Sequence, residues 1–141
     1  MFIVNVEGAI RKDDRWIIIE RSMKEEHAGG GLSLVGGKVE AKNTPNSLEK
    51  TLKREIAEEI GITIKDEMKY IHSITFTTDQ GIIVVDVIFL CEYESGTLEV
   101  KDYDEVESIY LMTTEEIINH PKTPDYVKGY IQMAEKALSG V

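Results

Sequence analysis

The chain has 141 residues, 42% of them hydrophobic, which is enough apolar material for one domain with a proper core. Its 26 acidic residues outnumber its 16 Lys and Arg residues, and the formal net charge of −10 argues against nucleic acid or an anionic membrane as the main partner. A single cysteine, Cys91, excludes an internal disulfide. Without a signal segment or a long apolar stretch, we expect one cytoplasmic domain over residues 1–141.

The first part of the chain alternates between apolar segments and polar turns. Two strands are expected at Phe2 to Gly8 and Trp16 to Ile19, with a turn at Lys12 to Asp14 between them. The polar, glycine-containing segment from Ser22 to Gly31 predicts a loop. A short strand is then expected at Leu32 to Val35.

A long central helix is predicted from about Ser47 to Ile60. Asn46 with Glu49 three residues later has the pattern of a capping box, and Gly61 supplies the stop. Apolar side chains recur at i+4 spacing and predict the buried face of this helix: Leu48, Leu52, Ile56 and Ile60.

The second part of the chain predicts further strands and then helices. Strands are expected at Tyr70 to Thr77, Ile82 to Glu92 and Glu107 to Met112. Thr113 with Glu116 caps a short helix, and Thr123-Pro124 starts a last helix. The buried side of this last helix is expected to carry Tyr126, Val127, Tyr130, Ile131 and Ala134. This order predicts a mixed α/β domain, in which a sheet is sandwiched between helices.

The run from Arg54 to Ile62 places three carboxylates near the end of the central helix. Glu55, Glu58 and Glu59 fall within roughly a 100° arc of the helix surface. Acids in the last turns face the negative end of the helix dipole, and like charges at this spacing repel by a few tenths of a kcal/mol. Hard divalent cations reverse the sign of each of these terms, so the run indicates a metal site.

Together with the segment Gly36 to Glu40, this run resembles the Nudix box. The family pattern is a glycine, five residues, a glutamate, seven residues and then Arg-Glu-apolar-x-Glu-Glu-x-Gly-apolar, and its second half is matched at every specified position. The first half departs from the pattern. Asn46 stands in place of the first glutamate, eight residues rather than five separate it from Gly37, and Val35 replaces the usual proline.

The resemblance implies a Nudix-type α/β/α sandwich with a central metal-bearing helix. It also implies hydrolysis of a pyrophosphate bond in a nucleoside diphosphate linked to another moiety. In this family Glu55, Glu58, Glu59 and the backbone carbonyl of Gly37 would hold Mg²⁺ or Mn²⁺, and Arg54 would orient Glu55 through a salt bridge. The alternative for Arg54 is a surface ion pair of little energetic value.

Family members also recruit an acid from a loop before a late strand, as a metal ligand or general base. Asp104 and Glu105 are the candidates here, and a solvated acidic loop is the alternative. Arg21, at the end of the second strand, and Lys38, after the paired glycines, are candidates for phosphate contacts, with a solvated surface charge as the alternative. Three strand aromatics are candidates for base stacking, although such residues more often belong to the core: Tyr70, Phe76 and Tyr110. No role is assigned to the histidines: His27, His72 and His120.

Two rival functions stay open beside an active hydrolase. An isomerase of allylic diphosphates on the same fold needs a cysteine in its pocket, whereas Cys91 lies in an apolar run typical of a buried hydrophobe. A non-catalytic nucleotide sensor typically lacks a metal carboxylate or carries an appended DNA-binding domain, and neither feature is seen. A small-molecule nucleotide is the expected substrate, first of all a nucleoside triphosphate by analogy. A homodimer is common for such folds.

Overall fold

The computed structural model describes residues 2–24, 29–40 and 42–140. No helix in this described part is long and apolar enough to span a membrane. In chain order the elements are β1 (Phe2–Lys12), β2 (Arg15–Arg21), β3 (Leu32–Ser33), β4 (Val35–Lys38), α1 (Ser47–Ile60), β5 (Ile62–Ile64), β6 (Lys69–Thr77), β7 (Ile83–Gly96), β8 (Val106–Met112), α2 (Thr114–Asn119) and α3 (Asp125–Leu138).

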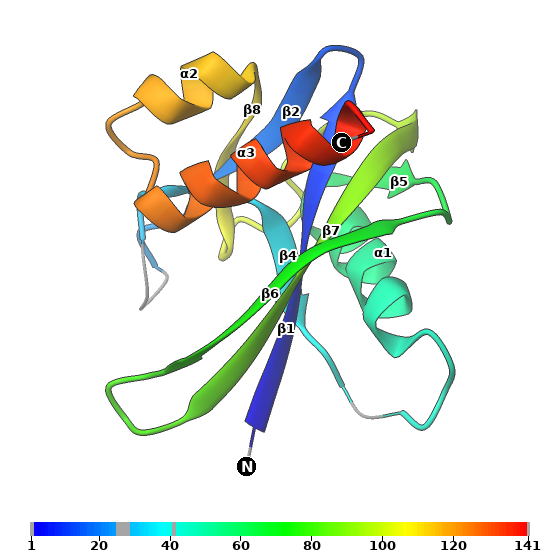
Figure 1. Ribbon diagram of the computed structural model, residues 1–141, viewed down its shortest axis with the longest axis vertical. Helices are drawn as coiled ribbons and strands as arrows, with labels where there is room; N and C mark the ends of the chain where they lie inside the picture. Colours follow the sequence, from blue (N-terminus) through cyan, green and yellow to red (C-terminus); the bar gives the residue numbers. More distant parts are fainter. Residues whose placement is uncertain (1, 25–28, 41, 141) are drawn as a thin grey trace.

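Strands β1 and β7 form the centre of a mixed sheet that has eight strands in the described part of the chain. These two strands run parallel, with Phe2 opposite Ile83 and Arg11 opposite Glu92. On the edge that faces away from β7, the first part of β1 pairs with β4 and its end pairs with β2. Strand β2 in turn pairs with β3 and β8. The other edge of β7 pairs with β6 and β5. All of these outer pairings are antiparallel, and the β6–β7 hairpin extends beyond the helices together with the start of β1 (Figure 1).

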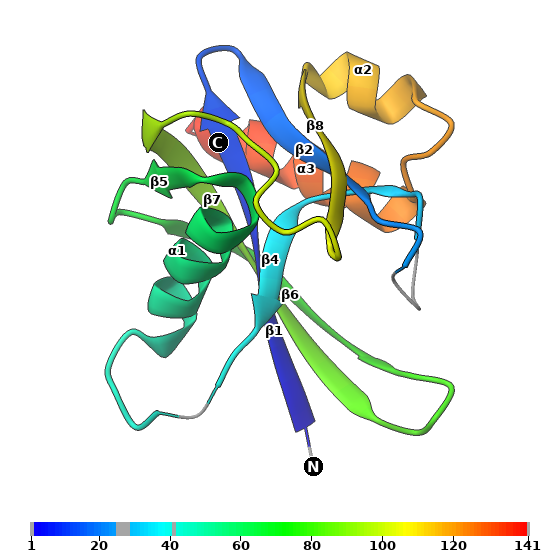
Figure 2. The same cartoon turned by 180° about the vertical axis from the view of Figure 1, so that it is seen from behind.

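The helices cover the two faces of this sheet, as the sequence predicts. Helix α1 lies on one face, and α2 and α3 lie on the other (Figures 1 and 2). Alternate side chains of β1 serve the two layers, because successive residues of a strand point to opposite faces. Val6 and Ile10 belong to the apolar cluster that includes Leu52 of α1, whereas Ala9 belongs to the cluster that includes Ile131 of α3.

The paired glycines lie inside a strand rather than after one. The predicted strand from Leu32 to Val35 is divided, because β3 pairs with β2 while β4 pairs with β1. Within β4, Gly36 lies opposite Glu7 and Gly37 opposite Val6. A Cβ atom at Gly36 would overlap the backbone oxygen of Val6, so only glycine allows this close approach of the two strands.

Helix α1 has the predicted bounds, but the predicted capping box at its start is wrong. Asn46 has φ 58° and ψ 37°, in the left-handed region, and its side chain makes no capping hydrogen bond. A capping side chain needs an extended backbone at this position, so the left-handed backbone of Asn46 excludes that role. The stop at Gly61 is confirmed, with φ 76° and its N–H donating to the carbonyl of Ala57 at 3.1 Å.

The predicted capping box of α2 is confirmed, since Glu116 N–H donates to Thr113 Oγ1 at 3.1 Å and Thr113 N–H donates to Glu116 Oε1 at 2.8 Å. On α3 the prediction holds for four of the five expected buried residues: Val127, Tyr130, Ile131 and Ala134. The prediction is wrong for Tyr126, which is 47% exposed.

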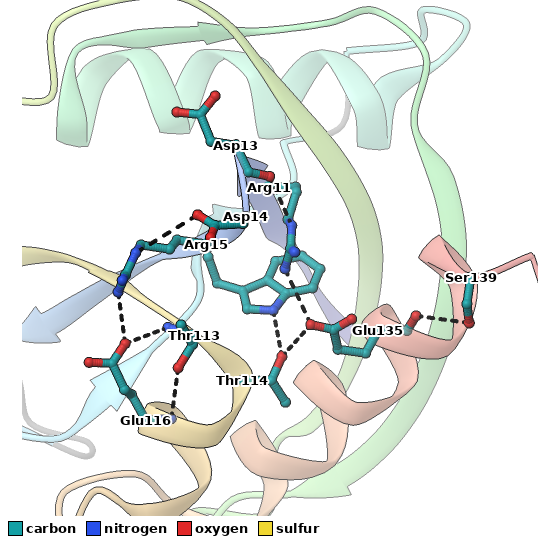
Figure 3. Close-up of polar contacts among 10 residues, drawn as sticks. Arg11, Asp13, Asp14, Arg15, Thr113, Thr114, Glu116, Glu135 and Ser139 are labelled. Carbon is teal, nitrogen blue, oxygen red and sulfur yellow. Dashed lines mark hydrogen bonds and ion pairs between the residues drawn. The ribbon is translucent and has the colours of Figure 1, made fainter.

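A half-buried network of hydrogen bonds joins the β1–β2 hairpin to helices α2 and α3 (Figure 3). Glu135 of α3 accepts from Arg11 Nη1 at 3.2 Å and from the hydroxyl of Thr114 at 2.5 Å. The same hydroxyl accepts from Trp16 Nε1 at 2.9 Å. The hydrogen bond from Thr114 holds the pKa of Glu135 below its usual value, so the carboxylate stays charged beside Arg11.

The left-handed backbone at Asn46 predicts an unusual order of substitutions. Asn46→Ser should lower the free energy of unfolding by about 1 kcal/mol, because serine tolerates this backbone poorly, whereas Asn46→Gly should leave it nearly unchanged. Urea unfolding measures both, with Asn119→Ser as a control that has no left-handed backbone. Full stability of Asn46→Ser would instead restore the capping role, since serine is a good cap.

Candidate functional site

A cavity of about 710 Å³ contains most of the residues that the sequence analysis selects. Its residues come from β1, β2, β3, β4, β6, β7, α1, α3 and the segments that precede β4 and β8. They include two groups, each made of polar side chains, with the backbone of Gly37 added to the first group. We call Gly37, Glu55, Glu59 and Glu105 the α1 group, and Glu7, Asp86, Tyr126 and Tyr130 the α3 group.

In the α1 group, Glu55 packs directly on the backbone of Gly37. A Cβ atom at Gly37 would lie 2.5 Å from Glu55 Cδ and 2.9 Å from Glu55 Oε1. Real Cβ contacts are never this short, so the glycine is required for the carboxylate to lie where it does. The neighbouring buried stripe of α1, which includes Leu52 and Ile56, fixes the rotation of the helix and hence the direction of Glu55.

Glu59 lies one helical turn further along α1 and is only 5% exposed. Burial raises the pKa of Glu59 to about 9, and the hydrogen bond to Glu55 together with the charges of Glu55, Glu105 and Asp102 adds to this shift. At neutral pH the metal-free protein therefore holds a proton on Glu59, which is hydrogen-bonded to Glu55. A divalent cation in place of this proton would neutralise both carboxylates.

No three or more His, Cys, Asp or Glu side chains among the described residues are arranged closely enough to hold a metal ion on their own. Mg²⁺ usually binds through one or two carboxylates and completes its shell with water and substrate phosphates. The pair of Glu55 and Glu59 beside the backbone of Gly37 fits this mode of binding. Its protonation also fits, because a proton is what buried neighbouring carboxylates retain when no cation is bound.

Arg54 and Glu58 lie next to the α1 group but not in the lining of the cavity. Arg54 Nη1 is 3.2 Å from Glu55 Oε1, so the salt bridge that the Nudix resemblance implies is present. The same nitrogen is 3.1 Å from Glu58 Oε2, and the Glu58 side chain is 55% exposed. The structure thus brings Glu55 and Glu59 together with Gly37, and it places Glu58 on the outer side with Arg54.

The loop before β8 is tied to the end of α1 and presents one of the two candidate acids to the cavity. Lys101 N–H donates to the carbonyl of Glu59 at 2.9 Å, and Ser22 N–H donates to the carbonyl of Glu105 at 3.0 Å. Glu105 lines the cavity, and its charge contributes to the raised pKa of Glu59. Asp104 instead lies outside, 83% exposed, and pairs with Lys24 at 3.3 Å.

Both basic candidates line the cavity. Arg21 ends β2 opposite Val106, the residue after Glu105, while Lys38 ends β4 directly after Gly37. Their positive charges stand among several carboxylates of the same cavity. Burial and the neighbouring Asp86 raise the pKa of Glu7 well above its usual value. The positive charge of Arg21 offsets a smaller part of this rise.

The three strand aromatics are all exposed, so the core alternative is wrong for each of them. Tyr70, Phe76 and Tyr110 are 55%, 42% and 41% exposed, and of the three only Phe76 lines the cavity. Tyr70 packs edge-on against Phe89, and the hydroxyl of Tyr110 donates to Glu20.

His72, His120 and Cys91 are not among the residues that line the cavity. The His72 ring lies 6.0 Å from that of Tyr130, His120 Nδ1 accepts from Lys122 N–H, and His27 lies outside the described residues. Cys91 is fully buried, as the buried-hydrophobe alternative predicts, and burial raises the pKa of its thiol to about 12. The isomerase alternative therefore lacks a cysteine in this cavity.

The α3 group contains two acids that the sequence analysis does not select. Glu7 lies in β1 and Asp86 in β7, and both face α3 across the sheet from α1. The sequence contains a signal for one of them, because Asp86 interrupts the otherwise apolar run from Ile82 to Cys91. A lone acid in such a segment is costly to bury unless a partner or ligand compensates it.

Comparison with known proteins identifies the fold that holds this cavity. The NUDIX domain family model matches residues 1–133 of the chain. The MutT NUDIX hydrolase of Burkholderia pseudomallei superposes with a TM-score of 0.78 at 23% identity, over 94% of this chain and 98% of that one. The MutT protein of Methanosarcina mazei Go1 superposes with a TM-score of 0.78 at 20% identity, over 97% and 95%.

A structure named UDP-X diphosphatase superposes with a TM-score of 0.72 at 17% identity, over 99% of this chain and 64% of that chain. No curated protein sequence matches the chain. At these low identities the structural neighbours establish the fold of the chain, whereas the family model establishes the family.

The raised pKa of Glu59 predicts how stability depends on pH when no metal is present. The folded protein binds this proton more tightly than the unfolded chain, whose glutamates titrate near pH 4.5, so stability should fall as pH rises from about 5 towards 9. Glu59→Gln removes this contribution and should give a flatter dependence. Urea unfolding in EDTA at pH 5.5 and pH 8 measures the difference, with the exposed Glu58→Gln as a control. Equal slopes for wild type and Glu59→Gln would contradict the raised pKa of Glu59.

Proposed function

The chain belongs to the NUDIX family and is a pyrophosphohydrolase of that family, and from this premise we propose that it hydrolyses a pyrophosphate bond in a nucleoside diphosphate linked to another moiety. The observation that carries the proposal is the packing of Glu55 on Gly37 beside the buried Glu59. This acidic pair shares its cavity with the basic residues Arg21 and Lys38. Such a combination suits a metal–pyrophosphate complex.

Glu55, Glu59 and the carbonyl of Gly37 would hold Mg²⁺ or Mn²⁺, the cofactor that we propose. When bound, this ion supplies charge neutralisation for the phosphates and acidifies a water molecule. Arg54 keeps Glu55 oriented through its salt bridge. We also propose Glu58 as a metal ligand on the outer side of the site. Its ion pair with Arg54 is exposed and weak, so little stability is lost when Glu58 binds a metal ion instead.

The remaining residues of the cavity would bind the substrate and move the proton. Arg21 and Lys38 bind phosphate oxygens, which carry the opposite charge. Glu105 accepts a proton from the attacking water as the general base, since its carboxylate is exposed to the cavity and lies near Glu59. Asp104, the other candidate, is turned outward and receives no part in the reaction.

A small nucleotide is the substrate class that we propose, with a nucleoside triphosphate as the first candidate. The cavity volume of about 710 Å³ suits a ligand of this size. We further propose a single cytoplasmic domain over residues 1–141 that forms a homodimer. Its net charge of −10 disfavours nucleic acid and anionic membranes as partners.

A Mg²⁺-dependent screen of nucleoside triphosphates and nucleotide sugars, with separation of the nucleotide products, tests the substrate class. No turnover of any of them would favour the sensor alternative.

Gly37→Ala is the sharpest test of the acidic pair. The added methyl group displaces the Glu55 carboxylate, and kcat should fall by about two orders of magnitude. Gly129→Ala is the matched control, because a Cβ atom at Gly129 meets nothing within 4 Å, and it should retain activity. Unchanged kcat in a folded Gly37→Ala variant, checked by circular dichroism, would refute the proposed position of the metal.

The adjacent acids of the loop before β8 allow a second comparison. Glu105→Gln should lower kcat by about 10²-fold or more if Glu105 is the general base, and Asp104→Asn should change it less than about twofold because its side chain is exposed. Steady-state kinetics at saturating Mg²⁺ measures both. Equal effects of the two substitutions would argue for a general effect of loop charge rather than for a base.

A further inference from the structure

Asp86 is a buried carboxylate at the centre of the sheet that lines the cavity. Its residue is 5% exposed, and in the sheet it lies between Asn5 of β1 and Ile74 of β6. One of its oxygens, Oδ1, has no hydrogen-bond partner within the described part of the chain. A buried carboxylate oxygen without a partner is destabilising, and a ligand that brings an N–H or O–H donor would remove this cost.

Glu7 and Tyr130 are the hydrogen-bond partners of the Asp86 carboxylate. The side chains of Glu7 and Asp86 are hydrogen-bonded to each other, and burial together with this bond raises the pKa of Glu7 well above its usual value. Oδ1 of Asp86 is left as a hydrogen-bond acceptor that faces no donor from the described residues, and it requires an N–H or O–H group from a ligand.

Flat and apolar side chains surround this acceptor. Phe76 and Ile74 of β6 are each 42% exposed, Tyr126 of α3 is 47% exposed, and all three line the same cavity as Asp86. The Tyr126 ring meets the Tyr130 ring edge-on, with centroids 6.0 Å apart. Large apolar surfaces left open around a single polar group are typical of sites for planar heterocycles.

We propose that Asp86 selects the base of the nucleotide by accepting a hydrogen bond from an exocyclic amino group. This proposal rests on the proposed function, because the α1 group would hold the pyrophosphate in the same cavity. Adenine, guanine and cytosine carry such an amino donor. Uracil and thymine carry a carbonyl oxygen at the position of the 4-amino group of cytosine, and this oxygen would face the carboxylate as one acceptor against another. Hypoxanthine lacks the 2-amino group of guanine.

The proposal predicts that nucleotides with the amino group are better substrates than matched nucleotides without it, and two pairs of nucleotides test this. GTP and ITP differ only in the 2-amino group, and CTP and UTP differ at the 4-amino position. We expect kcat/KM to favour GTP over ITP and CTP over UTP by about tenfold or more. In Asp86→Asn the amide both donates and accepts, so these ratios should fall to within about threefold or invert.

Asp79→Asn is the matched control, because Asp79 lies exposed in the β6–β7 turn and should keep the wild-type ratios. Wild-type ratios near one, or ratios that Asp86→Asn leaves unchanged, would overturn the assignment. The comparison within wild type does not depend on the folding of any variant.

Binding of GMP and IMP without metal separates this proposal from the proposed hydrolysis. Isothermal titration calorimetry should find tighter binding of GMP than of IMP, and loss of that difference in Asp86→Asn. If none of the nucleoside triphosphates and nucleotide sugars is turned over but GMP is still preferred, the role of Asp86 stands and the hydrolase proposal fails. If triphosphates are turned over without any amino preference, or neither monophosphate binds, the role of Asp86 is refuted.

Discussion

The packing of the Glu55 carboxylate on the backbone of Gly37 is the contact on which the site depends. Two chain segments meet there, the glycine strand β4 and helix α1, and the lack of a Cβ atom at Gly37 sets how closely they approach. Because Glu59 follows one turn later with 5% exposure, two carboxylates become neighbours away from bulk water. Such a pair must retain a proton or bind a cation, so the packing creates both the electrostatic cost and the reason for a metal.

The parallel pairing of β1 with β7 explains why acids from both layers of the fold reach one cavity. Val6 of β1 lies opposite Gly37, whereas Glu7 points to the other face and meets Asp86. Two consecutive residues of β1 therefore lie beside the two groups, Val6 beside Gly37 of the α1 group and Glu7 within the α3 group. If the α1 group holds pyrophosphate, the base of the same nucleotide would extend towards the α3 group, where the apolar side chains of Ile74, Phe76 and Tyr126 lie.

Helix bounds and the acidic run were predictable because they depend on local chemistry. The apolar stripe and Gly61 define α1 from sequence, and the capping box of α2 needs only Thr113 and Glu116. The error at Asn46 has a physical cause: the residue type suits both a cap and a left-handed backbone, and the path of the preceding loop selects the second. The helical period places Tyr126 on the buried side of α3 because this period cannot distinguish a residue of the core from one in a cavity wall.

The sequence alone determined the family resemblance, the order of the elements and the carboxylates of α1, because these features are encoded in short segments. Only the tertiary structure decided which acids share a cavity. It separated Glu105 from Asp104, turned Glu58 outward with Arg54, and joined Glu7 to Asp86, which lie far apart in the chain. The physical reason is that burial and pairing energies depend on strand register and loop path, and neither is set by neighbours in sequence.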